Sequence, residues 1–316
     1  MVPPSSVVIP TFARPAALDR CLEGLARQSV GAGEFEVVVV DDGSPTPISP
    51  AQGFGGRFEF RILRQDNAGP GVARNVGATA ARGETLAFID DDCVPDPGWL
   101  ESLAGAVRRR PGVLAGGSTR NGLEGSLCPE VTHLIVSVAY DYYNQADDGP
   151  RFFATNNLAC RRDDFLASGG FDPAFRVASE DREFCDRWAV QGRPMAWVPE
   201  ANVAHFHEQG LGDFLRLHAR YGRGAYRYHA TRRARGAGSM RDGFGFHSTF
   251  VSRFRRLAPQ GRSLGWHARA AGLLLAWQGA NAAGFLREML GGGAIASSAR
   301  ASGGAPDSPP SARPVP

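Results

Sequence analysis

The chain has 316 residues, of which 43% are hydrophobic and 21% are charged, and its formal net charge is +3. Fibrous, collagen-like and wholly disordered proteins are excluded, because the apolar content is near the globular average and the 40 glycines follow no fixed period. The five cysteines are scattered without a C-x-x-C pair, and the N-terminal residues lack the basic and apolar stretches of a signal peptide. We therefore expect a cytoplasmic protein with reduced thiols.

Short runs of β-branched residues alternate with longer segments of helical spacing between residues 7 and 207. This alternation predicts an α/β domain with a largely parallel sheet. We expect strands at 7–9, 36–40, 86–89, 158–160 and 195–198, and helices at 16–28, 75–81 and 181–191. The helix at 75–81 consists of small residues suited to close packing on a sheet. Residues 118–150 show a less regular pattern of apolar and polar residues, and no element is predicted there.

Two zones of different composition follow this domain. Residues 201–270 contain 13 arginines and 3 acidic residues, so the positive charge is concentrated there and the rest of the chain is acidic. Residues 268–290 are mostly apolar with polar interruptions, which predicts a buried or membrane-surface helix and not a membrane span. Residues 291–316 contain few apolar side chains that could be buried in a core. The predicted organisation is an α/β domain at 1–210, a basic helical region at 211–290 and a disordered tail at 291–316.

The most informative segment is the hydrophobic strand at 86–89, which runs directly into Asp90, Asp91 and Asp92. Adjacent carboxylates raise one another's pKa and repel unless a cation neutralises them. Oxygen ligands suit Mg²⁺ or Mn²⁺, and Mg²⁺ is commonly held by one or two carboxylates together with substrate phosphates. The alternative is a solvated acidic turn.

A second acidic pair, Asp41 and Asp42, follows the strand expected at 36–40 and precedes Gly43 and Ser44. In open α/β sheets, ligands bind beyond the carboxyl ends of the strands. Two acidic strand ends can therefore face one site, where one orients a nucleobase or ribose and the other holds a metal and a diphosphate. A simple turn is the competing interpretation of this pair.

Six short segments stand out in chain order, namely residues 8–12 (VIPTF), 39–44 (VVDDGS), 67–69 with 73–75 (NAG, ARN), 88–92 (FIDDD), 169–172 (GGFD) and 179–181 (SED). Taken together, these segments resemble the family 2 glycosyltransferases. The resemblance covers roughly residues 5–210. It implies a GT-A fold, in which helices flank a mixed sheet, a nucleotide-diphospho-sugar donor, a divalent cation and inversion at the anomeric carbon.

The resemblance also implies roles for individual residues. Asp181 matches the general base, and Glu180 binds an acceptor hydroxyl or positions Asp181. The cation, Mg²⁺ or Mn²⁺, is assigned to Asp92, Asp90 and His205, with hydrogen bonding as the alternative for His205. The nucleotide-sugar is assigned to Pro10, Thr11, Arg14, Asp41, Asp42, Arg74, Asp90, Asp91 and Asn157.

Further expectations attach to some of these residues. Asp42 favours a uridine donor, and Arg74 is expected near the diphosphate, with an ordinary surface helix arginine as the alternative. Strand alternation places His205 and His207 on the same side of an extended segment. Capping of the following helix is the structural alternative for Glu180 and Asp181, and it is compatible with catalysis.

The chemistry needs a carboxylate on the acceptor side to take the hydroxyl proton as that oxygen attacks the sugar. A metal offsets the charge that builds on the departing nucleoside diphosphate. Inversion in one displacement needs no protein nucleophile. The resemblance implies hexosyl transfer to a glycan or lipid-linked acceptor, in cell-surface polysaccharide, glycolipid or glycoconjugate synthesis.

Aromatic residues and arginines interleave in the basic region, at Phe214, Leu217, Tyr221, Tyr226 and Tyr228 among Arg216, Arg220, Arg223 and Arg227. This pattern is compatible with binding to nucleic acid or to an anionic membrane surface. The resemblance to the family favours the membrane, as peripheral contact of 214–290 at the inner face of the cell membrane. The alternative is an amphipathic helix packed on the α/β domain. We expect no nucleic-acid partner.

Two other functions compete with glycosyl transfer. A sugar-phosphate nucleotidyltransferase uses a related sheet and metal, but the sequence has no glycine-rich G-x-G loop after the first strand. An inactive GT-A scaffold in a glycan-assembly complex is the other, and the intact carboxylates at 90, 92, 180 and 181 count against it.

Overall fold

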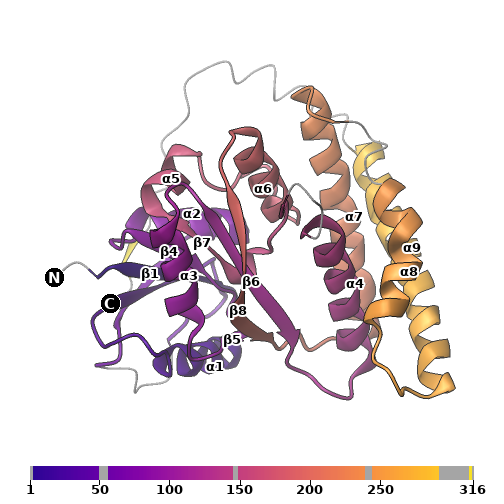
Figure 1. Cartoon of the computed structure of the whole chain (residues 1–316), viewed down its shortest axis with the longest axis horizontal. Coiled ribbons are helices and arrows are strands. Elements are labelled where there is room, and N and C mark those ends of the chain that lie inside the picture. The colour runs from indigo at the N-terminus through magenta and orange to yellow at the C-terminus, as the bar shows by residue number, and fades with distance from the viewer. Residues whose placement is uncertain (1–2, 50–55, 145–148, 239–243, 292–312, 315–316) are drawn as a thin grey trace.

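The computed structural model describes residues 3–49, 56–144, 149–238, 244–291 and 313–314. Figure 1 shows a half built around a sheet, which contains the N-terminal strands, beside a half built from long helices. The nine strands of the described residues form one sheet. They are β1 (Ser5–Thr11), β2 (Phe35–Asp41), β3 (Glu59–Arg64), β4 (Thr85–Phe88), β5 (Cys93–Pro95), β6 (Leu114–Asn121), β7 (Leu158–Arg161), β8 (Met195–His205) and β9 (Arg313–Pro314).

The strand order is β5-β8-β6-β7-β4-β1-β2-β3-β9. Strands β4, β1, β2 and β3 are parallel neighbours, and β6 is parallel to β8. Strand β7 runs antiparallel between β4 and β6, and β5 is antiparallel to β8. The sheet is therefore mixed, as expected for the GT-A fold, and less parallel than the alternation of elements alone predicts.

Helices cover both faces of the parallel strands, which explains their unbroken apolar sequences. On one face, Val37 and Val39 of β2 join a core with Leu22 of α1 (Pro15–Ala26) and Leu103 of α3 (Trp99–Arg109). On the other face, α2 (Pro70–Ala80) packs on β1 and β2. A Cβ on Gly77 of α2 would lie 2.4 Å from a Val8 methyl, so the predicted close packing of this small-residue helix is confirmed.

Four long helices form the second half (Figure 1). They are α4 (Leu127–Asn144), α7 (Leu211–Ala234), α8 (Phe244–Leu257) and α9 (Leu264–Gly291), and their shared core includes Val131, Phe214, Phe250 and Trp277. Helices α7 and α9 cross at two glycines. A Cβ on Gly222 or on Gly284 would each lie 1.9 Å from a carbonyl oxygen of the facing helix.

The segment 118–150 is more regular than predicted, because β6 extends to Asn121 and α4 follows it. The sequence of α4 contains a β-branched run, VTHLIVSV, which obscures the helical period. This helix also contacts β6, α7, α8 and α9, so its apolar residues are not confined to one stripe. The remaining helices are η1 (Thr155–Asn157), α5 (Arg162–Ala167) and α6 (Glu180–Val190).

Two predictions concern the C-terminal part. The apolar segment at 268–290 is helical, and none of the helices within the described residues is long and apolar enough to cross a membrane. Of the tail predicted to be disordered, Gly291 ends α9 and the strand β9 pairs with β3, whereas residues 292–312 and 315–316 lie outside the described residues. All five cysteines are free thiols, as predicted.

Many arginines of the basic region are paired with carboxylates. Arg223 and Arg227 of α7 both contact Glu288 of α9, at 2.7 and 2.5 Å. Arg232 contacts Asp186 of α6 at 3.0 Å. Helix α7, at the start of the basic region, is therefore packed on the rest of the molecule. This agrees with the alternative interpretation of its arginines and aromatic residues, a packed amphipathic helix.

Candidate active site

The carboxyl ends of β1, β2 and β4 meet at one edge of the sheet. Thr11, the last residue of β1, lies opposite Asp41, the last residue of β2. Strand β4 runs parallel to β1 and leads into Asp90 and Asp92. The two acidic strand ends therefore lie at one edge, as the sequence predicts.

A strained turn after β1 brings a cation to the acidic residues. Ala13 has a φ of 54°, a left-handed conformation that is unfavourable for a residue with a side chain. Its amide donates to Ser44 Oγ at 2.8 Å. The next residue, Arg14, contacts Asp91 at 2.6 Å and Asp92 at 2.7 Å. Arg14 thus offsets the charge of two adjacent carboxylates.

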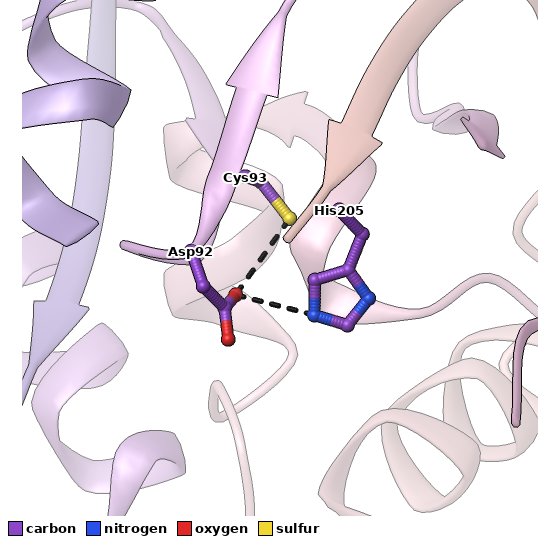
Figure 2. A group of neighbouring side chains, drawn as sticks. All are labelled: Asp92, Cys93 and His205. Atoms are coloured by element: carbon purple, nitrogen blue, oxygen red, sulfur yellow. Dashed lines mark hydrogen bonds and ion pairs between the residues drawn. The ribbon is translucent and has the colours of Figure 1, made fainter. Parts of the chain in front are cut away.

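Asp92 lies between two histidines from the end of β8 and the loop after it. Antiparallel pairing of β5 with β8 sets Cys93 opposite His205. His205 Nε2 lies 3.3 Å from Asp92 Oδ1, a contact drawn in Figure 2, and His207 Nδ1 lies 3.6 Å from Asp92 Oδ2. Both imidazoles face the same carboxylate, so their predicted placement on one side is confirmed.

The contact between Asp92 and His205 shifts the pKa values of both side chains. Burial acts to raise the pKa of Asp92, but hydrogen bonds with His205 and His207 outweigh it and hold that pKa well below its ordinary value. Burial acts to lower the pKa of His205, and the hydrogen bond with Asp92 reverses this, so that the pKa is raised. The carboxylate is therefore charged over the whole physiological pH range.

Asp92, Cys93 and His205 each offer a ligand atom within 4.8 Å of the other two (Figure 2). Burial and the nearby carboxylates raise the pKa of the Cys93 thiol well above its ordinary value, so it stays protonated and is a poor ligand. The remaining carboxylate and imidazole fit Mn²⁺ or Mg²⁺, with phosphate oxygens or water completing the shell. Asp90, also predicted as a ligand, is not in this group, and its carboxylate is paired with Arg74, so its role as a ligand stays a prediction.

Arg74 connects the two acidic motifs of the site. This residue of α2 is 2% exposed. Its guanidinium donates to Asp90 and, at 3.0 Å, to Glu180 Oε1. These contacts with two carboxylates raise the pKa of Arg74 although burial acts to lower it. A surface helix arginine, the alternative interpretation of Arg74, is therefore wrong.

The second acidic motif begins α6. Ser179, directly before the helix, has a φ of 71°, a second left-handed residue at the site. Asp181 follows Glu180 and accepts a hydrogen bond from the Arg182 amide at 2.7 Å. Burial, together with the charge of Glu180, raises the pKa of Asp181 to about 7. A carboxyl group with this pKa is suited to accept a proton near neutral pH.

One cavity of about 910 Å³ joins these groups. The sheet edge and the start of α6 form one side, and α4, α7, α8 and α9 contribute to the other. The residues predicted from the sequence that line it are Pro10, Thr11, Arg14, Asp42, Arg74, Asp90, Asp92, Glu180, Asp181 and His205. A space of this size, lined at one end by a metal-type donor set and by a carboxyl group of near-neutral pKa, can hold two substrates.

The sequence profile described as Glycosyl transferase family 2 matches residues 6–169, slightly more than half of the chain. The chain belongs to this family. It is 30% identical over 205 residues to the pre-mycofactocin glycosyltransferase of Mycobacterium tuberculosis, covering 63% of this chain and 43% of that protein. It is also 30% identical over 249 residues to the validoxylamine A glucosyltransferase of Streptomyces hygroscopicus, covering 68% of this chain and 59% of that protein. The chain thus spans about half the length of these relatives.

A solved structure shares the fold of this family 2 glycosyltransferase. It is the mannosyltransferase PcManGT from Pyrobaculum calidifontis, in complex with GDP-Man and Mn²⁺. The TM-score is 0.60 at 17% sequence identity, and the likeness covers 92% of this chain and 88% of that chain. The predicted GT-A fold is therefore confirmed.

Two carboxylates assigned to the nucleotide-sugar do not line the cavity. Asp41 accepts from the Ser44 amide at 2.9 Å and pairs with Arg64. Asp91 is fully buried and accepts from Thr11 Oγ1 at 2.7 Å. Their oxygens hold the chain turns after β1 and β2, and the assignment of Asp41 and Asp91 to the donor stays a prediction.

Asn157, also assigned to the nucleotide-sugar, is held by contacts within the fold. It is fully buried in η1, where it accepts from Trp99 Nε1 at 2.8 Å and donates to the carbonyls of Ser118 and Ala201, at 2.9 and 2.8 Å. These three contacts join α3, β6 and β8, so Asn157 serves the fold. Its neighbour Asn156 lines the cavity instead.

Asp42 lines the cavity and also orders the loop before α2. Its carboxylate accepts from the Gln65 side chain at 2.7 Å and from the amides of Ala68 and Gly69, each at 2.9 Å. Gly69 has a φ of 95°, which favours glycine, and begins the turn into α2. The contact of Asp42 with a base stays a prediction.

Sequence reasoning missed the aromatic side of the cavity. Tyr143 of α4, Phe246 of α8, and Trp277 and Phe285 of α9 line this side. The rings of Tyr143 and Phe246 are stacked with centroids 6.2 Å apart. These residues come from helices that are distant in sequence and have no shared motif, so no local signal identifies them.

Proposed function

We propose that the chain transfers a sugar from a nucleotide-diphospho-sugar to an acceptor hydroxyl, with inversion at the anomeric carbon. The observation that carries this proposal is the arrangement of one cavity, in which Asp92 and His205 offer a metal site and Asp181 offers a base with a pKa of about 7. Family membership supports the same reaction class. One displacement then needs no covalent intermediate on the protein.

In the proposed mechanism, Asp92 and His205 would hold Mn²⁺ or Mg²⁺, which would offset the negative charge that builds on the leaving diphosphate. Thr11 and Asp42 contact the nucleotide. Asp181 accepts the proton of the acceptor hydroxyl as the hydroxyl oxygen forms a bond with the anomeric carbon. The bond from that carbon to the diphosphate oxygen breaks in the same step, and the nucleoside diphosphate leaves with the bonding electrons.

Glu180 and Arg74 position these groups. The guanidinium of Arg74 joins Glu180 to Asp90, so the acidic motif on α6 keeps a fixed position relative to the strand end that precedes Asp92. The negative charge of Glu180 contributes to the raised pKa of Asp181. A buried guanidinium that contacts one carboxylate in each acidic motif restricts the motion of both motifs.

We extend the proposal to the substrates on the basis of the sequence. A UDP-hexose is the proposed donor, from the match at Asp42, and a glycan or lipid-linked molecule is the proposed acceptor. The proposed setting is glycan or glycolipid synthesis at the cytoplasmic face of the membrane. The aromatic side chains in the cavity suit an acceptor with an apolar part.

The products decide between the proposal and its rivals. Incubation with nucleotide sugars, Mn²⁺ and a panel of acceptors should release a nucleoside diphosphate in a stoichiometric ratio to glycosylated acceptor, with inverted anomeric configuration by NMR. Release of pyrophosphate from nucleoside triphosphate and sugar phosphate would identify a nucleotidyltransferase instead. A protein that binds neither Mn²⁺ nor any nucleotide sugar would be a scaffold.

A further inference from the structure

The outward face of α9 is apolar along its whole length. The inward side chains of this helix include Trp266, Ala270, Leu273 and Trp277, which are buried. An α-helix turns by 100° per residue, so the opposite side carries Leu264, Leu275, Leu286 and Leu290. These four leucines are 86%, 76%, 50% and 81% exposed.

Small residues, namely Ala268, Ala271, Gly272, Gly279 and Ala282, lie between these leucines on the same side, and the exposed Gln278 lies at its border toward α8. Helix α9 has 28 residues and is therefore about 42 Å long. Figure 1 shows α9 at the edge of the molecule, on the side of the helical half away from the sheet. Single exposed leucines are normal on soluble proteins, whereas a continuous row indicates a contact surface.

Within residues 244–291, the exposed charged side chains are all positive. Residues 244–291 contain one acidic residue, Glu288, which is 7% exposed and paired with Arg223 and Arg227. Arg269 and Arg287 are exposed and have no carboxylate partner within the described residues. They are 18 residues apart, which is five full turns, so both lie along the same border of the leucine row.

We propose that the outward face of α9 binds an anionic membrane surface and lies in its plane. The leucines insert at the boundary between head groups and acyl chains, and Arg269 and Arg287 contact lipid phosphates. A second copy of the chain would present the same apolar residues and cations without a carboxylate to pair with them. Charge complementarity therefore favours the lipid surface as the occupant.

This placement puts the catalytic cavity close to the membrane. Trp277, Asn281 and Phe285, on other sides of α9, line that cavity. An α-helix with side chains is about 10 Å across, so the cavity lies roughly one helix diameter from the leucine row. The membrane proposal rests on the surface alone and does not depend on the proposed transfer reaction.

Flotation with phospholipid vesicles tests the proposal. The full chain should bind vesicles of phosphatidylcholine with phosphatidylglycerol and bind phosphatidylcholine alone much more weakly, with binding reduced by salt. The double change Leu275→Glu and Leu286→Glu should lower partitioning by on the order of tenfold or more for each leucine. Replacing Arg269 and Arg287 by Gln should lower it about fivefold for each arginine.

Matched variants and a second measurement keep the test decisive. Val190→Glu places the same charge at an apolar side chain of α6 that is 68% exposed, and it should leave vesicle binding unchanged. Leu275→Ser with Leu286→Ser is a milder second pair, and thermal melts verify the fold of every variant. Equal binding by wild type and the leucine variants would overturn the proposal. So would a dimer in light scattering that these variants dissociate, because a second copy would then cover the face.

Discussion

The pH dependence of transfer gives a sharp test of the proposed base. The pKa of Asp181 is raised from 3.8 to about 7, first by burial and second by the charge of Glu180. A change of this size means that ionisation of this carboxyl group costs about 4 kcal/mol more free energy in the protein than in water. Because only the deprotonated form accepts a proton, kcat/KM should rise about tenfold per pH unit below pH 7 and level off above it.

Two substitutions on α6 separate the loss of the base from a change in its pKa. Asp181→Asn removes the base and should reduce transfer by about 10²-fold to 10⁴-fold while donor binding is kept. Glu180→Gln keeps an oxygen for Arg74 but removes the like charge, so the pKa of Asp181 should fall. The midpoint of the profile should then move to lower pH, on the order of one unit.

The assay is release of nucleoside diphosphate at saturating Mn²⁺, measured from about pH 5.5 to 8.5, on both sides of the Asp181 pKa. Asp186→Asn is the matched control, because it makes the same change on the same helix at a residue that does not line the cavity. This control should keep the wild-type profile. The base assignment is refuted by an Asp181→Asn variant with wild-type turnover, or by a Glu180→Gln profile with an unchanged midpoint.

Three further predictions concern stability, measured by urea unfolding. Arg74→Gln leaves Asp90 and Glu180 without their shared partner, and it should lower the free energy of unfolding by about 3 to 5 kcal/mol. Glu36→Gln removes a carboxylate whose pKa is lowered because hydrogen bonds, first from Ser6, outweigh the effect of burial. It should destabilise the protein at pH 7, and the difference should shrink as the pH falls below about 4, where the unfolded carboxyl protonates. Gly222→Ala should separate α7 from α9 and cost several kcal/mol or prevent folding, whereas the control Gly272→Ala on α9, with open space around it, should be neutral or stabilising.

The sheet and its acidic edge could be predicted because their signals are local. The valine run of β2 and the carboxylates after β4 each lie within one short segment, and the rule on strand ends places them together. His205 was assigned to the metal through the resemblance to the family. Its contact with Asp92 depends on the antiparallel pairing of β5 with β8, which no short segment encodes.

The helical half could be predicted only in part. A basic helical region after residue 210 was predicted, but α4 was missed because its β-branched residues hide the helical period. The aromatic side of the cavity requires α4, α8 and α9 to meet, and those contacts arise from tertiary packing. Asn157 resembles a ligand-binding residue in its motif, yet three buried partners use its amide for the fold.

The most direct test of the central claim is metal-dependent binding of a nucleotide sugar in this cavity. Thermal melts of the full chain with UDP-, GDP- and dTDP-sugars, each with and without Mn²⁺, measure it because a ligand that binds the folded state raises the melting temperature. We predict a rise for one nucleotide class that requires Mn²⁺ and is lost in Asp92→Asn, while Asp96→Asn, at a partly exposed carboxylate that does not line the cavity, keeps it. No rise with any of these sugars, or an equal rise in the Asp92→Asn variant, would contradict the account.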